Sequence, residues 1–417
     1  MKPLRESPGV KPNAEKAALG ALVKIGPLKR AFIAMFQAVS YPLVRLVETV
    51  TAAKPVSGKV DSILVLQAWQ LGDALLILPF LRNLRLHFPE ARICLLASDV
   101  VKKTLENQGV ADEWITVKLP WVQSHSRWKK YNPFSHLWID LWQILSAVRR
   151  RKFDLAMYGG IDVRDNFLLW LTQANRRVSY GFAGGSFFLT DPVTPDLVNV
   201  HRVDIWLNLI KHLGLPVVQH EADFRLTEEQ QEFRRSRCRE LGISEDEFVV
   251  GIHPGARIPL RKWGNENFAE VARALGSCKN IKILWFLGPY EEYQETGVDP
   301  AIISYVQLPL SQFMGMLSRC DLLICNDSGP MHMACAMGVP AVAVFGPQEP
   351  AWYGPTGKNS RAVYRPEFWC RPCSDYCIFD EPYCLRSVTP QMVVSAASNV
   401  IDEVGNPRTK ATEVRET

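Results

Sequence analysis

The chain has 417 residues, enough for two domains with separate cores, and 47% of them are hydrophobic, as in an ordinary globular protein. Lys and Arg number 48 against 43 Asp and Glu, and the resulting net charge of only +5 argues against a general nucleic-acid binder. Ten cysteines are too dilute for a disulfide scaffold and indicate a reducing compartment.

Residues 1–57 form a basic extension that precedes any strand pattern. Within it, Ala31 to Val44 is mostly apolar, and its large side chains are spaced to share one helical face until Pro42 bends the chain. This stretch is too short to cross a bilayer, which needs about 20 residues, and no clear signal-peptide cleavage site follows it. We expect residues 24–50 to bind an anionic membrane surface; the alternative is a helix packed on its own domain.

Residues 58–225 are predicted to form an N-terminal Rossmann-like domain, because strand and helix patterns alternate as in βαβ units. The predicted strands are Ile63–Leu66, Ile93–Ala97, Trp114–Val117, Leu155–Tyr158 and Arg177–Tyr180, with helices over Leu75–Leu86 and Leu137–Arg150. Leu119 to Pro133 is rich in Trp, Lys, Tyr and His. We predict a long loop there, which either faces a substrate or packs on its own domain.

The first strand is followed by Leu71-Gly72-Asp73, which opens the next helix. This turn lacks a glycine fingerprint and instead brings a carboxylate to the carboxyl end of a strand, where open α/β sheets bind ligands. We predict that Asp73 is a general base, which accepts the proton of an attacking hydroxyl group. The alternative is that Asp73 is only an N-cap.

Residues 226–405 are predicted to form a second domain of the same kind, which begins with the charged helical segment Leu226–Leu241. Its predicted strands are Phe248–Ile252, Ile281–Phe286, Leu322–Cys325 and Ala341–Phe345, and residues 406–417 form a polar tail. The predicted fold class is therefore α/β, with two doubly wound domains that face each other across a cleft.

Two turns of the second domain are predicted to hold a diphosphate. In the first, Gly255 and Ala256 are small enough for a phosphate to approach the main chain, although a glycine after a strand is often only a turn. Arg261 and Lys262 follow as two cations before the next helix. They offer charge and hydrogen-bond donors to a diphosphate without a metal ion.

The second turn is Asp327-Ser328-Gly329, which opens a helix whose N-terminal dipole favours an anion. Asp327 has an alternative role as an N-cap, and His332, one turn into the helix, either bonds a phosphate or packs. Glu291 follows another strand and is predicted to bind paired ribose hydroxyls, with an ordinary surface carboxylate as the alternative. These residues predict a nucleotide-sugar site that uses no metal and no cofactor.

A base on one domain and a diphosphate site on the facing domain together indicate a transfer reaction. A sugar leaves a nucleoside diphosphate through an oxocarbenium-like transition state, while Asp73 accepts the proton of the attacking hydroxyl. A single base opposite the diphosphate gives inversion at the anomeric carbon. We therefore predict an inverting glycosyltransferase; the alternative from another class is a non-catalytic nucleotide-sugar-binding scaffold.

A cluster of four cysteines, Cys370-x2-Cys373-x3-Cys377-x6-Cys384, lies near the C-terminus. Four cysteines can hold a structural zinc, but this spacing lacks the two paired CxxC knuckles of a zinc ribbon. The spacing favours free thiols or a labile disulfide in a loop.

Four blocks of the sequence resemble glycosyltransferase family 9, the heptosyltransferases of lipopolysaccharide core assembly. The blocks are Leu71–Leu76 with Pro79, His253–Ala256 with the basic pair before Trp263, Asn326–His332, and Gly338–Pro340 leading to Phe345–Pro347 and Pro350. The likeness covers roughly residues 60–400 and leaves the basic extension outside it.

The resemblance implies a GT-B fold, metal-independent transfer from an ADP-heptose type donor, and a lipid-linked glycan acceptor at the cytoplasmic face of the inner membrane. It assigns the catalytic base to Asp73, and donor contacts to Gly255, Ala256, Ser328, Gly329 and Glu291. Where the family usually has Lys two positions before the tryptophan, this chain has Arg261 with Lys262 beside it. A family member that uses another nucleotide sugar for a different surface polysaccharide is the alternative.

Overall fold

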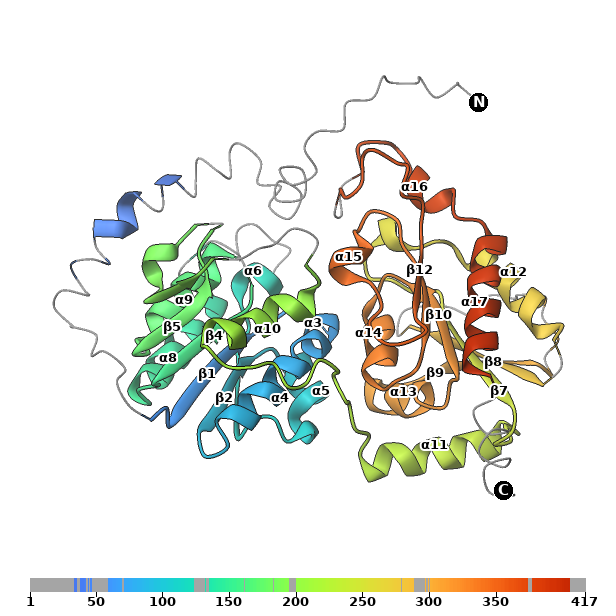
Figure 1. Cartoon of the computed structure of the whole chain (residues 1–417), viewed down its shortest axis with the longest axis horizontal. Helices are drawn as coiled ribbons and strands as arrows, with labels where there is room; N and C mark the ends of the chain where they lie inside the picture. The colour runs from blue at the N-terminus through green and yellow to red at the C-terminus, as the bar shows by residue number, and fades with distance from the viewer. Residues whose placement is uncertain are drawn as a thin grey trace.

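Two parallel β-sheets with helices packed against them make up the computed structural model of the chain (Figure 1). It describes residues 34–35, 38–42, 44, 46, 59–69, 71–123, 132, 135–160, 162–182, 184–194, 200–278, 280–288, 297, 299, 301–373 and 377–405. Helices α3 (Leu71–Leu76) and α14 (Gly329–Ala336) lie next to each other between the two sheets.

The first sheet has the strand order β3-β2-β1-β4-β5-β6, and all its strands are parallel. Its strands are β1 (Ser62–Gln67), β2 (Arg92–Ala97), β3 (Glu113–Thr116), β4 (Leu155–Tyr158), β5 (Arg176–Tyr180) and β6 (Asp191–Val193). The central strands are buried at consecutive positions, so both faces of the sheet are covered. Its helices are α3, α4 (Leu78–His87), α5 (Asp99–Leu105), α6 (Pro120–Gln123), α8 (His136–Arg150), α9 (Val163–Thr172) and α10 (Arg202–His212).

The second sheet has the strand order β12-β11-β10-β7-β8-β9 and is also parallel throughout. Its strands are β7 (Phe248–His253), β8 (Ile281–Leu287), β9 (Ile303–Gln307), β10 (Leu322–Asn326), β11 (Ala341–Val344) and β12 (Arg361–Val363). Its helices are α11 (Glu228–Glu240), α12 (Asn265–Gly276), α13 (Leu310–Leu317), α14, α15 (Pro350–Tyr353), α16 (Tyr383–Arg386) and α17 (Pro390–Val404). Counted in chain order within each sheet, the two arrangements are the same, which confirms two doubly wound domains.

Each sheet has one point where the strand order reverses, and these points position the predicted site. The reversal falls between β1 and β4 in the first sheet and between β7 and β10 in the second. Open parallel sheets bind ligands outside the carboxyl ends of the strands at this switch point. The turn with Asp73 follows β1, while the turns with Gly255 and Ser328 follow β7 and β10.

One predicted helix is interrupted in the structure. The pattern over Leu75–Leu86 predicts a single helix, but α3 ends at Leu76 and α4 begins at Leu78. Pro79 has no backbone N–H and cannot continue the helical hydrogen bonding, so the helix is interrupted at Ile77, two residues before it. The predicted loop from Leu119 begins with the short helix α6, and residues 124–131 are outside the described part.

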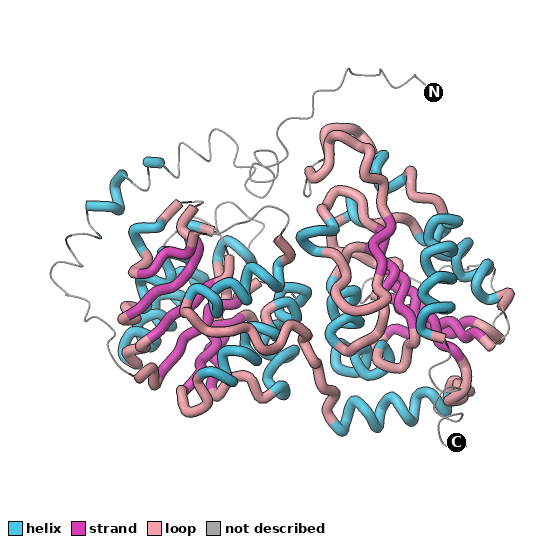
Figure 2. The backbone as a smooth tube through the Cα atoms, in the orientation of Figure 1, coloured by secondary structure: helices cyan, strands magenta, loops and turns pink. Residues whose placement is uncertain are grey.

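The chain passes from the first domain to the second between α10 and α11, along one edge of the molecule (Figure 2). This crossing segment is anchored to both domains. The Phe224 backbone N–H donates to the Ala336 carbonyl oxygen at 2.9 Å, and the Arg82 guanidinium donates to the Asp223 carbonyl oxygen at 2.9 Å. The contacts fix the end of α14 relative to the first domain.

Only part of the basic extension lies within the described residues, and that part is helical. Val44 is buried against the first domain, and the rings of Tyr41 and Phe187 are 5.6 Å apart. Met35, Val39 and Leu46 are exposed. Among the described residues no helix is both long and apolar enough to cross a membrane. The predicted membrane contact of residues 24–50 falls mostly outside the described part and stays a prediction.

Candidate active site

Asp73 lies in the first turn of α3, as its third residue, so it is not the N-cap that the alternative required. The turn is anchored to the end of β1, because the Gln67 side-chain amide donates to the Asp73 carbonyl oxygen at 2.9 Å. Gln67 is buried, whereas Asp73 is half-buried and remains accessible at the end of the sheet.

The first donor turn follows β7, where Gly255 is buried and Ala256 is half-buried. The chain then forms the 3-10 helix η3 (Pro259–Arg261), and α12 begins at Asn265. The guanidinium of Arg261 lies 3.2 Å from the carboxylate of Asp327, while Lys262 is exposed. Of the two neighbouring cations, Arg261 is therefore the one that reaches the second donor turn.

Asn326 links the two donor turns through its side-chain amide. It donates to the Pro254 carbonyl oxygen at 2.6 Å and accepts from the Trp263 backbone N–H at 3.1 Å. Asn326 is fully buried at the end of β10. One amide therefore sets the spacing of the turn after β7 and the segment before α12 relative to the second turn.

The second donor turn opens α14, with Ser328 as the N-cap. The alternative role of Asp327 as the N-cap is therefore wrong. The Ser328 hydroxyl donates to the Asn326 carbonyl oxygen at 3.2 Å and makes no capping hydrogen bond to α14. The dipole at the N-terminus of α14 favours an anion there.

The two domains meet where α3 approaches α14. A Cβ atom on Gly72 would lie 3.0 Å from Cδ2 of His332, and one on Gly329 would lie 3.4 Å from Cδ2 of Leu71. The first turn of α3, which carries Asp73, therefore lies beside the start of α14 (Figure 1). Burial, with smaller contributions from the charges of His201 and Arg261, lowers the pKa of His332 to about 3. His332 is thus a neutral side chain, not a cation, at neutral pH.

Comparison with known proteins identifies the family. The model of glycosyltransferase family 9 (heptosyltransferase) matches residues 141–382, more than half of the chain. The chain belongs to glycosyltransferase family 9. Lipooligosaccharide heptosyltransferase 2 of Campylobacter jejuni is 23% identical to it over 348 residues, which span 81% of this chain and 97% of that relative. Lipopolysaccharide heptosyltransferase 3 of Escherichia coli is 23% identical over 78% of this chain and 95% of its own.

Solved structures of similar proteins share the fold of this family 9 glycosyltransferase. The family 9 glycosyltransferase of Veillonella parvula is 25% identical, with a TM-score of 0.67 over 83% of this chain and 99% of the other. Escherichia coli heptosyltransferase WaaC with ADP-2-deoxy-2-fluoro heptose is 18% identical, with a TM-score of 0.60 over 82% and 99%. The predicted GT-B fold is confirmed.

Sequence reasoning missed a basic pair that the first domain of this glycosyltransferase brings to the interface. The Arg202 guanidinium donates to the Tyr353 hydroxyl at 2.9 Å and lies 5.3 Å from the ring centroid, while His201 Nε2 is 3.1 Å from the Gly354 carbonyl oxygen. Burial lowers the pKa of Arg202, but Tyr353 and the charge of Asp73 more than offset this and raise it. No motif marks these residues in the sequence, because their partners are about 150 positions away.

Glu291, the predicted ribose ligand, lies outside the described residues. The family assignment therefore leaves its role as a prediction.

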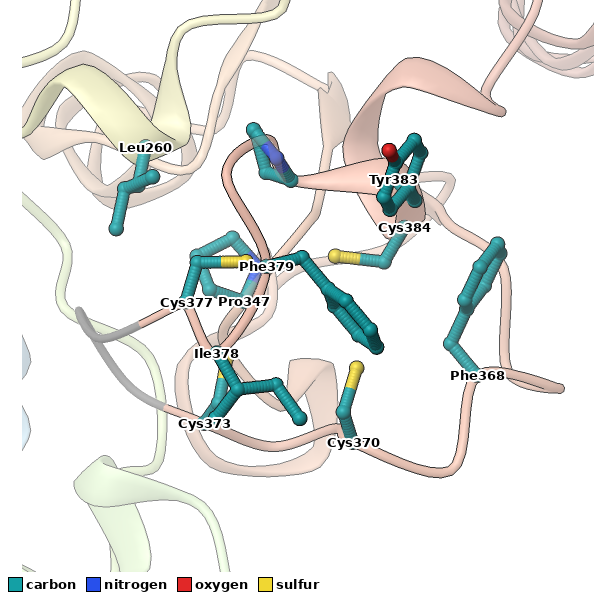
Figure 3. A pocket seen from close by; sticks show the side chains of 11 residues that line it. Leu260, Pro347, Phe368, Cys370, Cys373, Cys377, Ile378, Phe379, Tyr383 and Cys384 are labelled. Atoms are coloured by element: carbon teal, nitrogen blue, oxygen red, sulfur yellow. The ribbon is translucent and has the colours of Figure 1, made fainter. Parts of the chain in front are cut away.

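The four cysteines of the C-terminal cluster line one pocket with Leu260, Pro347 and aromatic side chains (Figure 3). None of the four is in a disulfide bond in the described part of the chain. Burial raises the pKa of Cys384. In the part of the chain that the structure describes, no three His, Cys, Asp or Glu side chains are grouped to hold a metal ion. The pocket shares Leu260 with the 3-10 helix that ends at Arg261, so it adjoins the segment that carries this cation.

Proposed function

We propose that this protein is an inverting heptosyltransferase that moves a heptose from ADP-heptose to a lipid-linked oligosaccharide in lipopolysaccharide core biosynthesis. One observation carries the proposal: the first turn of α3, which carries Asp73 at the switch point of the first sheet, lies against the start of α14 at the switch point of the second. A base and an anion site thus meet from opposite domains. Relatives named heptosyltransferases, and a structural neighbour solved with an ADP-heptose analogue, support the choice of sugar and nucleotide.

The donor diphosphate is held on the second domain. Main-chain groups at Gly255, Ala256, Ser328 and Gly329 contact phosphate oxygens, and Arg261 neutralises their charge together with Lys262. Asp327 orients Arg261 through their ion pair. Glu291 binds the ribose hydroxyls.

His332 completes this donor site as a neutral hydrogen-bonding group. Its Nδ1 is buried and lacks a hydrogen-bond partner among the described residues. An unsatisfied buried polar atom costs about 1–3 kcal/mol, which a phosphate oxygen of the donor would recover. The side chain stays uncharged at neutral pH because burial, above all, lowers its pKa.

The chemical step needs one proton acceptor. Asp73 takes the proton of the acceptor hydroxyl, whose oxygen forms a bond to the anomeric carbon on the face opposite the diphosphate. The bond from that carbon to the diphosphate oxygen breaks, and ADP leaves with the electron pair. Arg202, which lies near Asp73, adds positive charge from the first domain as the leaving group becomes more negative.

The arginines and the α14 dipole supply the charge that a divalent metal supplies in other transferases, so we propose metal-independent transfer. Incubation with EDTA followed by gel filtration should leave the rate of transfer unchanged. Loss of activity that returns on addition of one divalent metal would show that a metal takes part.

We also propose that the protein works as a peripheral membrane protein at the cytoplasmic face, where the basic extension holds it near its lipid-linked acceptor. The exposed Met35, Val39 and Leu46 support an apolar contact, and the surrounding basic residues support attraction to anionic lipid. Deletion of residues 1–57 should release the protein from anionic vesicles in a sedimentation assay. Sedimentation that persists after the deletion would place the contact elsewhere.

The decisive test of the transferase reaction is Asp73→Asn. An enzyme with this base keeps ADP affinity in calorimetry but loses turnover by about 10²-fold or more. A scaffold that only binds nucleotide sugars has no turnover to lose. A thermal-shift screen of ADP, UDP and GDP with their sugars separates heptose transfer from use of another donor, since the preferred nucleotide stabilises the protein most.

A further inference from the structure

A fully buried carboxylate lies behind the turn that carries Asp73. Asp165, in the first turn of α9, has no exposed surface. Its Oδ2 accepts hydrogen bonds from the Tyr158 hydroxyl at 2.5 Å and from the Trp69 indole at 3.3 Å, and its Oδ1 accepts one from the Trp121 indole at 3.1 Å. Burying a carboxylate costs several kcal/mol, and hydrogen bonds from three neutral donors offset this cost less than a cation would. A contribution to stability alone therefore does not explain a carboxylate at this position.

The three donors come from separate parts of the first domain. Tyr158 ends β4, Trp69 lies in the turn between β1 and α3, and Trp121 belongs to α6. Because β1 and β4 are the neighbours at the switch point, Asp165 joins the two sides of the position where a ligand would bind. It also joins them to α6, which begins the aromatic segment that is predicted either to face a substrate or to pack on its own domain.

Trp69 is well placed to control where Asp73 points. It precedes Asp73 by four residues, in the turn that leaves β1. The backbone of this turn is held by Ser98, whose hydroxyl donates to the Trp69 carbonyl oxygen at 3.0 Å, and by Gln67 at the Asp73 carbonyl. The indole bond to Asp165 adds a third anchor, from the side of α9.

The backbone after β4 makes room for this network. A Cβ atom on Gly160 would lie 2.0 Å from the Tyr158 hydroxyl oxygen, so a residue with a side chain there would displace the hydroxyl from Asp165. Burial and the charge of Asp162 raise the pKa of Asp165 to about 7, against the opposing hydrogen bonds from Tyr158 and Trp121 and the charge of Arg164. Burial therefore makes the charge of Asp165 unfavourable. What this residue contributes is its hydrogen bonds to Trp69, Trp121 and Tyr158.

We propose that Asp165 is a positioning residue for sugar transfer, which holds Trp69 and Trp121 so that the Asp73 turn faces α14 and the acceptor side keeps its shape. This inference rests on the proposed function, because it assigns Asp165 to the reaction that Asp73 performs. In this role Asp165 makes no contact with substrate itself.

The test compares two tryptophans. Trp69→Phe removes the indole N–H that binds Asp165. Trp170→Phe is the matched control, since Trp170 is also buried, lies on the same helix as Asp165, and its indole nitrogen has no hydrogen-bond partner among the described residues. Asp165→Asn changes the acceptor of the same network. An amide has one oxygen and one nitrogen, so its two side-chain atoms cannot accept hydrogen bonds from both indoles.

Two measurements are made on the full-length protein. We expect Trp69→Phe and Asp165→Asn to lower kcat about 10- to 100-fold with the donor KM unchanged, as for a displaced catalytic group, whereas Trp170→Phe keeps the wild-type kcat. We also expect hydrogen exchange of the amides in residues 71–76 to speed up at least about fivefold in the first two variants and not in the control.

The outcomes separate this inference from the proposed function. Wild-type kcat and exchange in Asp165→Asn, or equal losses in Trp69→Phe and Trp170→Phe, would overturn the positioning role. If Trp69→Phe does not fold, Asp165→Asn and Trp121→Phe decide the question in the same two measurements. If the wild-type protein transfers no sugar from any nucleotide donor, the proposed function is wrong, and the positioning role in transfer is wrong with it; exchange in residues 71–76 then decides only whether Asp165 holds the turn.

Discussion

The contact between Gly72 and His332 gives a sharp test of how the two domains close. A Cβ atom on Gly72 would lie 3.0 Å from Cδ2 of His332, so the ring or the helix must shift by a few tenths of an ångström. Overpacking of this kind costs about 1–3 kcal/mol. Alanine is also the better helix former, by up to about 1 kcal/mol, and this gain applies whether or not the domains are in contact.

Gly72→Ala should therefore reduce activity without reducing stability. If the steric cost falls on the closed arrangement that transfers the sugar, kcat/KM decreases about 5- to 150-fold. The urea midpoint of unfolding stays equal to that of the wild type or rises. Steady-state kinetics with varied donor, together with urea titration followed by circular dichroism, measures both quantities.

A double-mutant cycle shows whether the effect passes through His332. Because His332→Ala removes the ring that Cβ would meet, Gly72→Ala should cost little further activity in that background, with a coupling energy of about 1 kcal/mol or more. An equal loss of activity in both backgrounds would refute the reasoning, since the alanine would then act on α3 itself and not on the contact between domains.

The remaining predictions concern the donor turns and the buried carboxylate. Asn326→Ala leaves two buried backbone groups without partners and should lower the free energy of unfolding by about 2–4 kcal/mol in urea titrations, with weaker ADP binding. Arg261→Ala removes the cation that lies 3.2 Å from the buried carboxylate of Asp327 and should destabilise the protein by about 3–5 kcal/mol. Lys262→Ala, at a neighbouring exposed cation, should change stability by less than about 0.5 kcal/mol, and similar unfolding curves for the two variants would contradict the ion pair. Since the folded pKa of Asp165 is raised to about 7 from 3.8, its contribution to stability is complete below about pH 4 and is lost as the pH rises through 7. Relative to Asp165→Asn, the wild type should lose roughly 1 kcal/mol per pH unit between pH 5 and 7 in chemical denaturation, and parallel profiles would mean that this carboxyl group is not shifted.

The central strands of both sheets could be predicted because residues buried on both faces form continuous apolar runs. The edge strands β6, β9 and β12 could not. They are short or partly exposed, and β6 contains Pro192 while β12 begins with an exposed Arg361, so neither forms an apolar run or an alternating pattern. The edge strand β3 could be predicted nevertheless, because Trp114–Val117 is apolar except for Thr116.

The same distinction applies to the site. Asp73, Gly255 and Ser328 could be named because each follows a recognisable strand, and strand ends meet at the switch point. The roles of Arg202 and Asp165 could not be predicted. Each depends on a partner distant in sequence, Tyr353 for Arg202 and Trp69 for Asp165, and no spacing rule connects them.

The pocket lined by the C-terminal cysteine cluster adjoins the segment that carries Arg261, and this position has a practical consequence. Leu260 lines the pocket and is the neighbour of Arg261 within a single turn of 3-10 helix. We expect a nucleotide that moves Arg261 to move Leu260 with it and so to change the surroundings of the four sulfur atoms. An environment-sensitive dye coupled to one of these cysteines would report donor occupancy from outside the reaction centre.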